Sequence, residues 1–400
     1  MITEKKKDLK SIACGYEQYL AKVRRDLHKI PELAFEEEKT IAYLKQEIEA
    51  IIAKSPLKIS LKEMKGGLVV DVFIEKSLKR LLFRADIDAL PITEETGLEY
   101  SSTHLGKMHA CGHDMHATML LGAFKCICEQ NVESLHNLSF VWQRAEERKV
   151  NGISGGEMLV GEGVLIDVDE VYALHINPSV ETGKFLCRAG PMMANTNQFH
   201  IEIKTTGGHV ARPNLGTNAI DVLIEMQNAA RGALERILYP YEEAILVPSI
   251  IQAGTIYNVR PASGKCCFVF RHYLSDQRAK EVKEQLTKKL TAIVSSYEDC
   301  FISIFSYIEG YPILTNDLTS TEKVKNLLES NGSIVYEMTK SFGGEDFAYY
   351  LEKKPGSLWL LGAKGDFASD LHTSKMNPNE LALVDGLIFW LLLATSNLKL

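Results

Sequence analysis

The sequence lacks a long apolar run, a basic block and a C-x-x-C pair of cysteines, and each absence excludes a class of protein. The longest apolar run, residues 387–394, is much shorter than the roughly 20 residues that cross a bilayer, so we expect a buried helix there. The net charge is -7, and residues 5–7 are the only short basic run, so nucleic acid is not an expected partner. The eight cysteines contain no C-x-x-C pair, which argues against a disulfide framework and a zinc ribbon.

The N-terminal ten residues are charged and lack the apolar run of a secretory signal, which predicts a cytoplasmic protein with reduced thiols. With 400 residues and 46% hydrophobic content, the chain can form two or three domains of about 100 to 200 residues each. It contains no internal repeat and no low-complexity linker. Composition therefore allows a substantial folded enzyme with no membrane partner.

Residues 109–116 hold three His, one Cys and one Asp, the pattern of a metal site. Cys111 and His113 are the best ligand pair, because Gly112 between them lets the backbone bend toward one ion. His116 would share a helix face with His113, and we favour a supporting role for it over ligation. The alternative is a buried reduced cysteine beside core histidines, which suits this density of ligands less well.

Acidic side chains follow two apolar segments that are expected to form strands. Asp86 and Asp88 end the first strand and point to the same side, so one of them can orient a metal-binding histidine, or both can cap a turn. Glu146 and Glu147 follow the second strand and point in different directions, so one can hold a metal while the other faces the substrate. An exposed acidic pair beside neighbouring arginines is the alternative. His175 ends another strand and is ambiguous alone.

The order of expected elements indicates a two-domain α/β protein. Helices, strands and metal-site residues occupy the first part, and residues 190–306 then follow the βαββαβ order of a ferredoxin-like α+β sandwich. The α/β pattern returns afterwards. We therefore predict a catalytic domain formed by residues 1–189 and 307–400, with 190–306 inserted as a second domain.

Short motifs run through almost the whole chain, namely Arg25-Asp26-Leu27-His28 with Pro31-Glu32-Leu33, Arg84-Ala85-Asp86-Ile87-Asp88-Ala89-Leu90-Pro91, His109-Ala110-Cys111-Gly112-His113-Asp114, Ala145-Glu146-Glu147, Ala173-Leu174-His175, Gly207-Gly208-His209, Gly343-Gly344-Glu345-Asp346-Phe347 and Leu371-His372. In this order they resemble the aminoacylase and dipeptidase family of dinuclear metallopeptidases. Within it, they are most similar to the amidohydrolases of hippurate, N-acyl amino acids and auxin conjugates. The resemblance implies a metallopeptidase-type catalytic domain with an inserted dimerisation or lid domain, and a homodimer.

The resemblance also implies roles for single residues. Glu146 is the general base and acid, and Asp88 takes the place of the family's ligand-orienting Asp. His209, which in family dimers reaches into the partner's site, and Asn258 are donors to the oxyanion. Arg271 either clamps a substrate carboxylate or forms a surface ion pair. The implied ligands of two divalent ions are Cys111, His113, Glu147, His175 and His372. Zinc suits this set best, while manganese, cobalt and nickel are compatible with it.

Three positions near the expected substrate pocket depart from the family pattern. Arg144 stands where a proline is common, Asn214 where a second histidine follows, and Arg260 where isoleucine is usual. The charge of Arg144 is expected to depress the pKa of Glu146 or to select an acidic substrate. Because of these departures, the substrate specificity of any one family member is a weak guide to the specificity of this chain.

The resulting prediction is a dinuclear amidohydrolase that cleaves N-acyl amino acids or related small conjugates, with Glu146 activating a water that bridges the metals. One alternative is an exopeptidase, such as a dipeptidase or carboxypeptidase, that uses the same residues. Another is a metal-binding or small-molecule-binding protein that has lost turnover, which the three departures suggest. The complete set of five ligands and a base argues against that last alternative.

Overall fold

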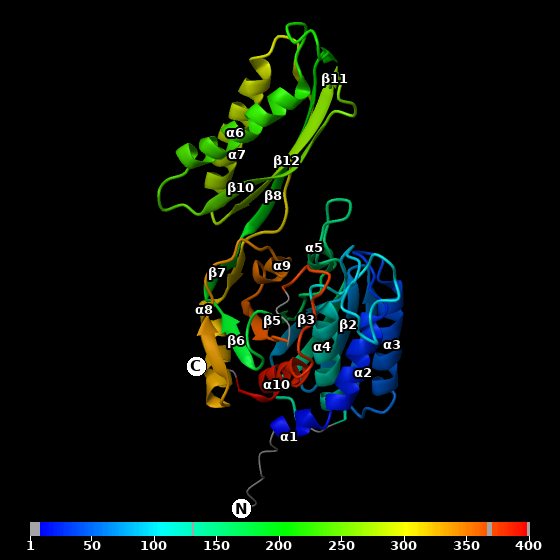
Figure 1. Cartoon of the computed structure of the whole chain (residues 1–400). Helices are drawn as coiled ribbons and strands as arrows, with labels where there is room; N and C mark the ends of the chain where they lie inside the picture. The colour runs from blue at the N-terminus through cyan, green and yellow to red at the C-terminus, as the bar shows by residue number, and fades with distance from the viewer. Residues whose placement is uncertain (1–8, 130–131, 366–369, 398–400) are drawn as a thin grey trace, which may run out of the picture. The chain divides into compact units, whose positions relative to one another are not determined.

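The computed structural model describes residues 9–129, 132–365 and 370–397, and the chain divides into two units that are described separately (Figure 1). Unit 1 comprises Met1–Met192, Leu314–Lys340 and Glu345–Leu400, and unit 2 comprises Met193–Ile313 and Ser341–Gly344. The charged segment of residues 1–8, on which the cytoplasmic prediction depends, lies outside the described residues. No described helix is both long and apolar enough to cross a membrane.

Unit 1 is built on an eight-stranded sheet with the order β1-β2-β4-β3-β5-β16-β6-β15. Its helices are α1 (Leu9–Cys14), α2 (Glu17–His28), α3 (Glu38–Ile52), α4 (His113–Cys128), α5 (Gly155–Gly161), α8 (Leu318–Ser330), α9 (Ala348–Leu351) and α10 (Ala382–Thr395). Its strands are β1 (Lys58–Met64), β2 (Gly67–Phe73), β3 (Arg80–Asp86), β4 (Asn137–Gln143), β5 (Glu170–Asn177), β6 (Lys184–Cys187), β15 (Ile334–Glu337) and β16 (Gly356–Gly362), with β7 (Gly190–Met193) and β14 (Leu314–Asn316) in a separate pair.

The centre of unit 1 is apolar because its middle strands are buried on both faces. Every residue of β4 and β16 is buried. Helix α4 packs against β3, β4 and β5, and α2, α3 and α10 pack against α4 in turn. Strands β4, β3 and β5 run parallel to one another, so their carboxyl ends meet at one edge of the sheet. In an open α/β sheet this edge is where ligands bind.

Unit 2 has the predicted βαββαβ order and an antiparallel sheet in the order β10-β12-β8-β13, which confirms the ferredoxin-like arrangement. Its elements are β8 (Asn195–Lys204), β9 (Gly208–His209), α6 (Ala219–Ile237), β10 (Ala244–Ala253), β11 (Val259–Arg260), β12 (Ser263–His272), α7 (Asp276–Ser295) and β13 (Phe301–Ile308). The predicted boundary at 306 falls inside β13, whose pairing with β8 continues to Ile308.

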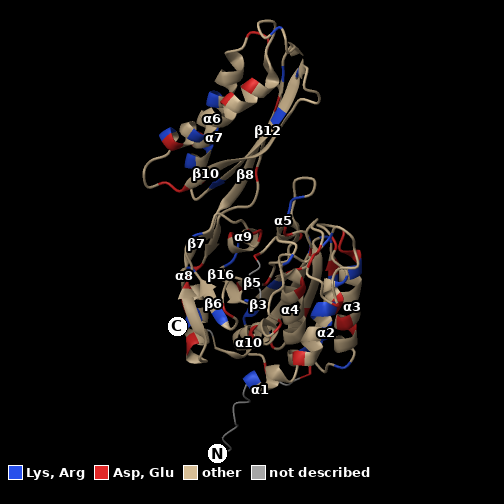
Figure 2. Cartoon of the chain, in the orientation of Figure 1, with Lys and Arg blue, Asp and Glu red and all other residues tan. Residues whose placement is uncertain are grey.

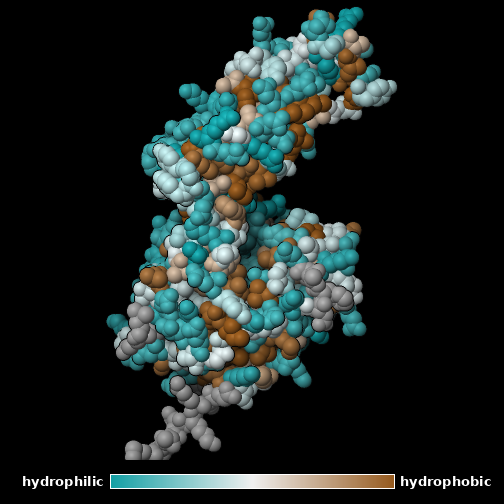
Figure 3. Space-filling view, turned by 60° about the vertical axis from the view of Figure 1, so that its left-hand side comes forward, coloured by the Kyte–Doolittle hydropathy of each residue, from teal (hydrophilic) through white to brown (hydrophobic). Residues whose placement is uncertain are grey.

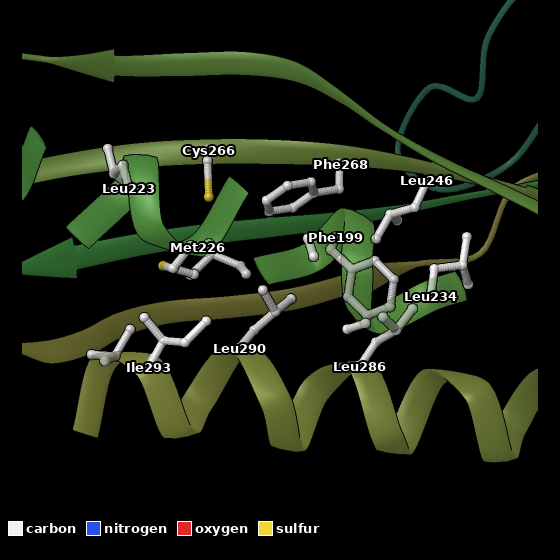
Figure 4. Close-up of a cluster of buried hydrophobic side chains, with 14 of the residues drawn as sticks. Phe199, Leu223, Met226, Leu234, Leu246, Cys266, Phe268, Leu286, Leu290 and Ile293 are labelled. Atoms are coloured by element: carbon white, nitrogen blue, oxygen red, sulfur yellow. The ribbon is translucent and has the colours of Figure 1, made fainter. Parts of the chain in front are cut away.

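The core of unit 2 lies between its two helices and one face of the sheet (Figure 4). Phe199 on β8 and Phe268 on β12 meet Leu286 and Leu290 of α7 and Met226 of α6. Alternate residues of β8 are buried because successive strand side chains point to opposite faces. Basic and acidic residues are interspersed on α6 and α7 (Figure 2), as expected for solvent-facing helix surfaces.

Candidate metal centre

The candidate ligands converge at the carboxyl edge of β3, β4 and β5 in unit 1. Cys111 and His113 flank the start of α4, and Gly112 between them has a φ of 88°. A Cβ on Gly112 would lie 2.3 Å from Ile176 Cδ1, so both the backbone conformation and the lack of space require glycine. His175 lies on β5. The sequence therefore predicted the bend correctly at this position.

Two groups of ligand atoms share the Cys111 sulfur. The first group is Cys111, His113 and His175, and the second is Cys111, Glu147 and His372, with the atoms of each group within 4.8 Å of one another. Cys111 Sγ lies 3.4 Å from His175 Nε2 and 3.3 Å from His372 Nε2. Glu147 Oε1 lies 3.7 Å from His113 Nε2 and 3.5 Å from His372 Nε2. The structure thus brings together all five predicted ligands.

The unsatisfied atoms of this cluster fit a pair of cations. Among the described residues, His113 Nε2 and Glu147 Oε1 are buried and have no hydrogen-bond partner, although buried polar atoms almost always have one. Burial and the nearby Glu147 and Glu146 raise the pKa of the Cys111 thiol well above its usual range. Burial raises the pKa of Glu147 to about 7. A divalent cation would reverse both effects, and mixed thiolate, imidazole and carboxylate ligands suit such ions.

Asp88 contacts two of the candidate ligands at once. Its Oδ1 lies 3.1 Å from His113 Nδ1, and its Oδ2 accepts the Glu147 backbone N–H at 2.9 Å. His175 Nδ1 is held in the same way, by the Ile176 carbonyl at 2.7 Å. These contacts leave the Nε2 atoms of both histidines directed at the cluster. They support the predicted ligand-orienting role of Asp88, which stays a prediction.

His116 lies on the same helix face as His113 but has both ring nitrogens occupied. Its Nδ1 is 2.6 Å from Asp86 Oδ1, and its Nε2 accepts the Ile176 N–H at 2.9 Å. A histidine whose two ring nitrogens both form hydrogen bonds has no lone pair left for a metal, so this geometry favours the predicted supporting role of His116. Both carboxylate oxygens of Asp86 also have partners, because Oδ1 contacts His116 and Oδ2 pairs with Arg84 at 2.7 Å.

Glu146 is buried among other acidic groups. Asp346 donates its backbone N–H to Glu146 Oε1 at 3.4 Å, and Glu345 and Asp346 are close enough to form a further acidic group with it. Burial, Glu345 and Glu147 raise the pKa of Glu146 well above its usual range. The expected depression of this pKa by Arg144 is therefore wrong. The Arg144 guanidinium instead pairs with Glu37 and Glu38.

Arg84 is a residue that the sequence reasoning missed. This fully buried guanidinium pairs with Asp86 at 2.7 Å, Asp346 at 2.7 Å and Glu345 at 3.1 Å. The single positive charge of Arg84 is thus shared by three carboxylates near Glu146. The available signal was a charged residue inside an otherwise apolar strand, because such a residue is buried only when it is paired.

The residues predicted in the smaller domain lie in unit 2. His209 on β9 is exposed, and it pairs across to β11 directly after Asn258. Arg271 on β12 is partly buried and forms no ion pair with a described residue, so the surface ion-pair alternative is not supported. Burial lowers its pKa. These positions leave the roles of all three residues as predictions.

Arg260, one of the three departures, organises the loop that carries His209. The buried guanidinium donates to five backbone carbonyls, those of Gly207, Arg212, Pro213, Leu215 and Gly216. The Arg260 guanidinium therefore holds the loop through these hydrogen bonds and is not available to contact a substrate.

Comparisons with known proteins identify the family and several relatives of the chain. Residues 82–395 match the model of peptidase family M20/M25/M40. The chain is 35% identical over 373 residues to an N-acetyldiaminopimelate deacetylase of Halalkalibacterium halodurans, covering 91% of this chain and 95% of that one. It is 33% identical over 376 residues to the N-acetyl-L-cysteine deacetylase of Bacillus subtilis, covering 93% and 86%.

Solved structures show the same fold. A putative aminohydrolase of methicillin-resistant Staphylococcus aureus superposes with a TM-score of 0.81 at 27% identity, covering 97% of this chain and 99% of that one. A Bacillus subtilis protein described as a dinuclear metal-binding peptidase of the M20 family superposes with a TM-score of 0.75 at 27% identity, covering 96% and 98%.

Proposed function

The chain belongs to peptidase family M20/M25/M40, and on that premise we propose that it is a metal-dependent amidohydrolase of N-acyl amino acids. The observation that carries the proposal is the pair of ligand groups that share Cys111, with Glu146 buried beside them. Two relatives are deacetylases of N-acetyl amino acids, so an acetyl group is the first acyl group to test.

The proposed reaction uses the site residues in separate roles. When bound, two divalent ions polarise the amide carbonyl and make a water molecule more acidic. Glu146 takes a proton from the attacking water as the new carbon–oxygen bond forms, and it gives that proton to the leaving nitrogen as the amide bond breaks. The products are a free amino acid and a carboxylate. The residues that would hold the ions, with zinc the best match and manganese, cobalt or nickel compatible, are Cys111, His113, Glu147, His175 and His372.

Substrate recognition is assigned to residues of unit 2. Arg271, without an ion-pair partner among the described residues, would bind the carboxylate of the amino acid through a bidentate contact. His209 and Asn258, which the pairing of β9 with β11 brings together, would donate hydrogen bonds to the oxyanion. We expect Arg271→Leu to raise KM for N-acetyl amino acids and to leave KM unchanged for N-acetyl amines, which lack a carboxylate. An equal rise for both would contradict the assignment.

A homodimer is also proposed, supported by apolar side chains on the sheet of unit 2. Val247, Ile250 and Ile251 on the edge strand β10 are 47%, 40% and 41% exposed. The space-filling view shows apolar surface gathered on this unit (Figure 3). An exposed apolar edge strand favours pairing with another chain. We expect Ile251→Glu to lower the mass measured by light scattering from two chains to one, and a monomeric wild-type protein would contradict the proposal.

The function is tested with purified protein reloaded separately with Zn, Mn, Co or Ni. N-acetyl-diaminopimelate, N-acetylcysteine, other N-acyl amino acids and dipeptides are supplied, and released amino acid is measured. We expect cleavage of acyl conjugates over dipeptides, whereas dipeptide preference would favour an exopeptidase. Glu146→Gln should abolish turnover with unchanged metal content, and Glu162→Gln, at an exposed glutamate, is the matched control. Two bound ions without turnover on any substrate would indicate a binding protein.

A further inference from the structure

Ala145, the residue before Glu146, has a backbone conformation that alanine rarely adopts. Its φ is 51°, and it is fully buried two residues after the end of β4. A left-handed conformation is unfavourable for a residue with a side chain, so it persists only where neighbours hold it. The direction of the Glu146 side chain depends on this conformation, because the two residues share a peptide bond.

Both backbone polar groups of Ala145 are fixed by residues distant in sequence. Its N–H donates to Glu37 Oε1 at 2.9 Å, and its carbonyl accepts the Gly155 N–H at 3.0 Å. Glu37 is fully buried at the N-cap position of α3. The same Oε1 accepts the N–H of Phe35 at 3.0 Å, and Phe35 also has a positive φ, of 61°. One carboxylate oxygen thus holds two left-handed residues.

Arg144 binds the second carboxylate oxygen of Glu37. Its Nε donates to Glu37 Oε2 at 2.9 Å, and its guanidinium also contacts Glu38. Its backbone N–H donates to the Gly66 carbonyl at 2.9 Å. Burial raises the pKa of Glu37 to about 7, and the charge of Arg144 opposes that rise. The contact with Arg144 therefore favours the ionised form of Glu37 and holds its carboxylate where it accepts the Ala145 N–H.

We propose that Glu37 and Arg144 are positioning residues for Glu146, because they hold Ala145 in its left-handed conformation and so fix the direction of the catalytic carboxylate. This inference rests on the proposed function of Glu146. Neither residue touches the ligand cluster, so their effect passes through the backbone of Ala145. Arg144 stands where related enzymes often have proline, and in this chain it has a definite structural task.

The test is Glu37→Gln, with kcat, KM and metal content measured on an N-acetyl amino acid. We expect kcat to fall about tenfold, as for a small misplacement of a catalytic group, with KM within about twofold and metal content unchanged. Adding Ala145→Gly should recover about threefold of the loss, because glycine adopts positive φ without strain. Asn151→Gly is the matched control, since Asn151 also has a positive φ, of 53°, but lies exposed in a loop.

Thermal unfolding supplies a readout that does not depend on activity. Ala145→Gly should raise Tm less in the Glu37→Gln protein than in the wild type, because the strain that glycine relieves is present in full only where Glu37 holds Ala145 left-handed, whereas Asn151→Gly should change Tm equally in both. Unchanged kcat in Glu37→Gln, or equal rescue by both glycines, would overturn the inference. If Glu37→Gln does not fold, Arg144→Gln carries the same comparison. A wild-type enzyme inactive on every substrate would refute the proposed function, and the Tm comparison would still decide the inference.

Discussion

Replacing Gly112 with alanine would place a methyl group where the structure has no room. The new Cβ would lie 2.3 Å from Ile176 Cδ1 and 2.6 Å from its Cγ1, at a φ of 88°. The backbone conformation alone costs alanine about 1 kcal/mol. Overpacking against a buried side chain adds about 1–3 kcal/mol. We therefore expect Gly112→Ala to lower the free energy of unfolding by about 2–4 kcal/mol.

Gly152→Ala separates the two contributions. Gly152 has nearly the same φ, 86°, but a Cβ there meets nothing within 4 Å. We expect this control to lose only the backbone contribution, about 1 kcal/mol. Both variants are compared by urea denaturation of the metal-free protein, so that lost metal binding does not enter the measurement.

Metal binding gives the second readout. Gly112 joins Cys111 to His113, so a backbone shift that relieves the overlap with the Ile176 side chain would move one of these two ligands. We expect Gly112→Ala to retain less zinc after dialysis than Gly152→Ala. Equal stability losses for the two variants, with equal zinc retention, would refute the packing argument.

Three further outcomes follow from other buried groups. Arg84→Met should cost about 3–5 kcal/mol in thermal denaturation, because three carboxylates lose their cation, and a loss below 1 kcal/mol would contradict this. Asp88→Asn should weaken metal affinity about 10- to 100-fold in a competition titration while Tm of the metal-free protein changes little. Burial lowers the pKa of His272 to about 4, so the unfolded chain binds the proton more tightly. Stability should therefore fall by up to about 3 kcal/mol as the pH drops from about 6.5 to 4, and His272→Gln should flatten that slope.

The sequence predicted the parts of the fold whose signal is local. The apolar run of β3 predicts a strand over residues 80–86, and helical periodicity predicts α6 over 218–238 and α7 over 276–297, each within two residues of the structure. Strand β1 was missed, because it lies at the edge of the sheet and alternates exposed with partly buried residues. The order of strands in the sheet is a property of long-range packing and left no local signal.

The site residues also fall into those with a local sequence signal and those without one. Cys111 and His113 were found from spacing alone, because their relative placement depends on one glycine between them. His175 and His372 were identified only through resemblance, since each is a single histidine on a separate segment. His372 has a φ of 62° and reaches the cluster from a loop more than 190 residues beyond His175. Glu37 carried no signal, because an acidic residue before a helix is ordinarily a solvent-exposed cap.

The position of β16 has a consequence for synthesis of the chain. This strand, Gly356–Gly362, pairs with β5 on one side and with β6 on the other. Once residue 313 has left the ribosome, every strand of the unit 2 sheet is free to pair, whereas the sheet of unit 1 still lacks a strand in its middle. Unit 2 can therefore fold while unit 1 waits for one of its last strands. Until then, β5 and β6 expose unpaired backbone edges, and a chain truncated before residue 356 would keep them exposed permanently.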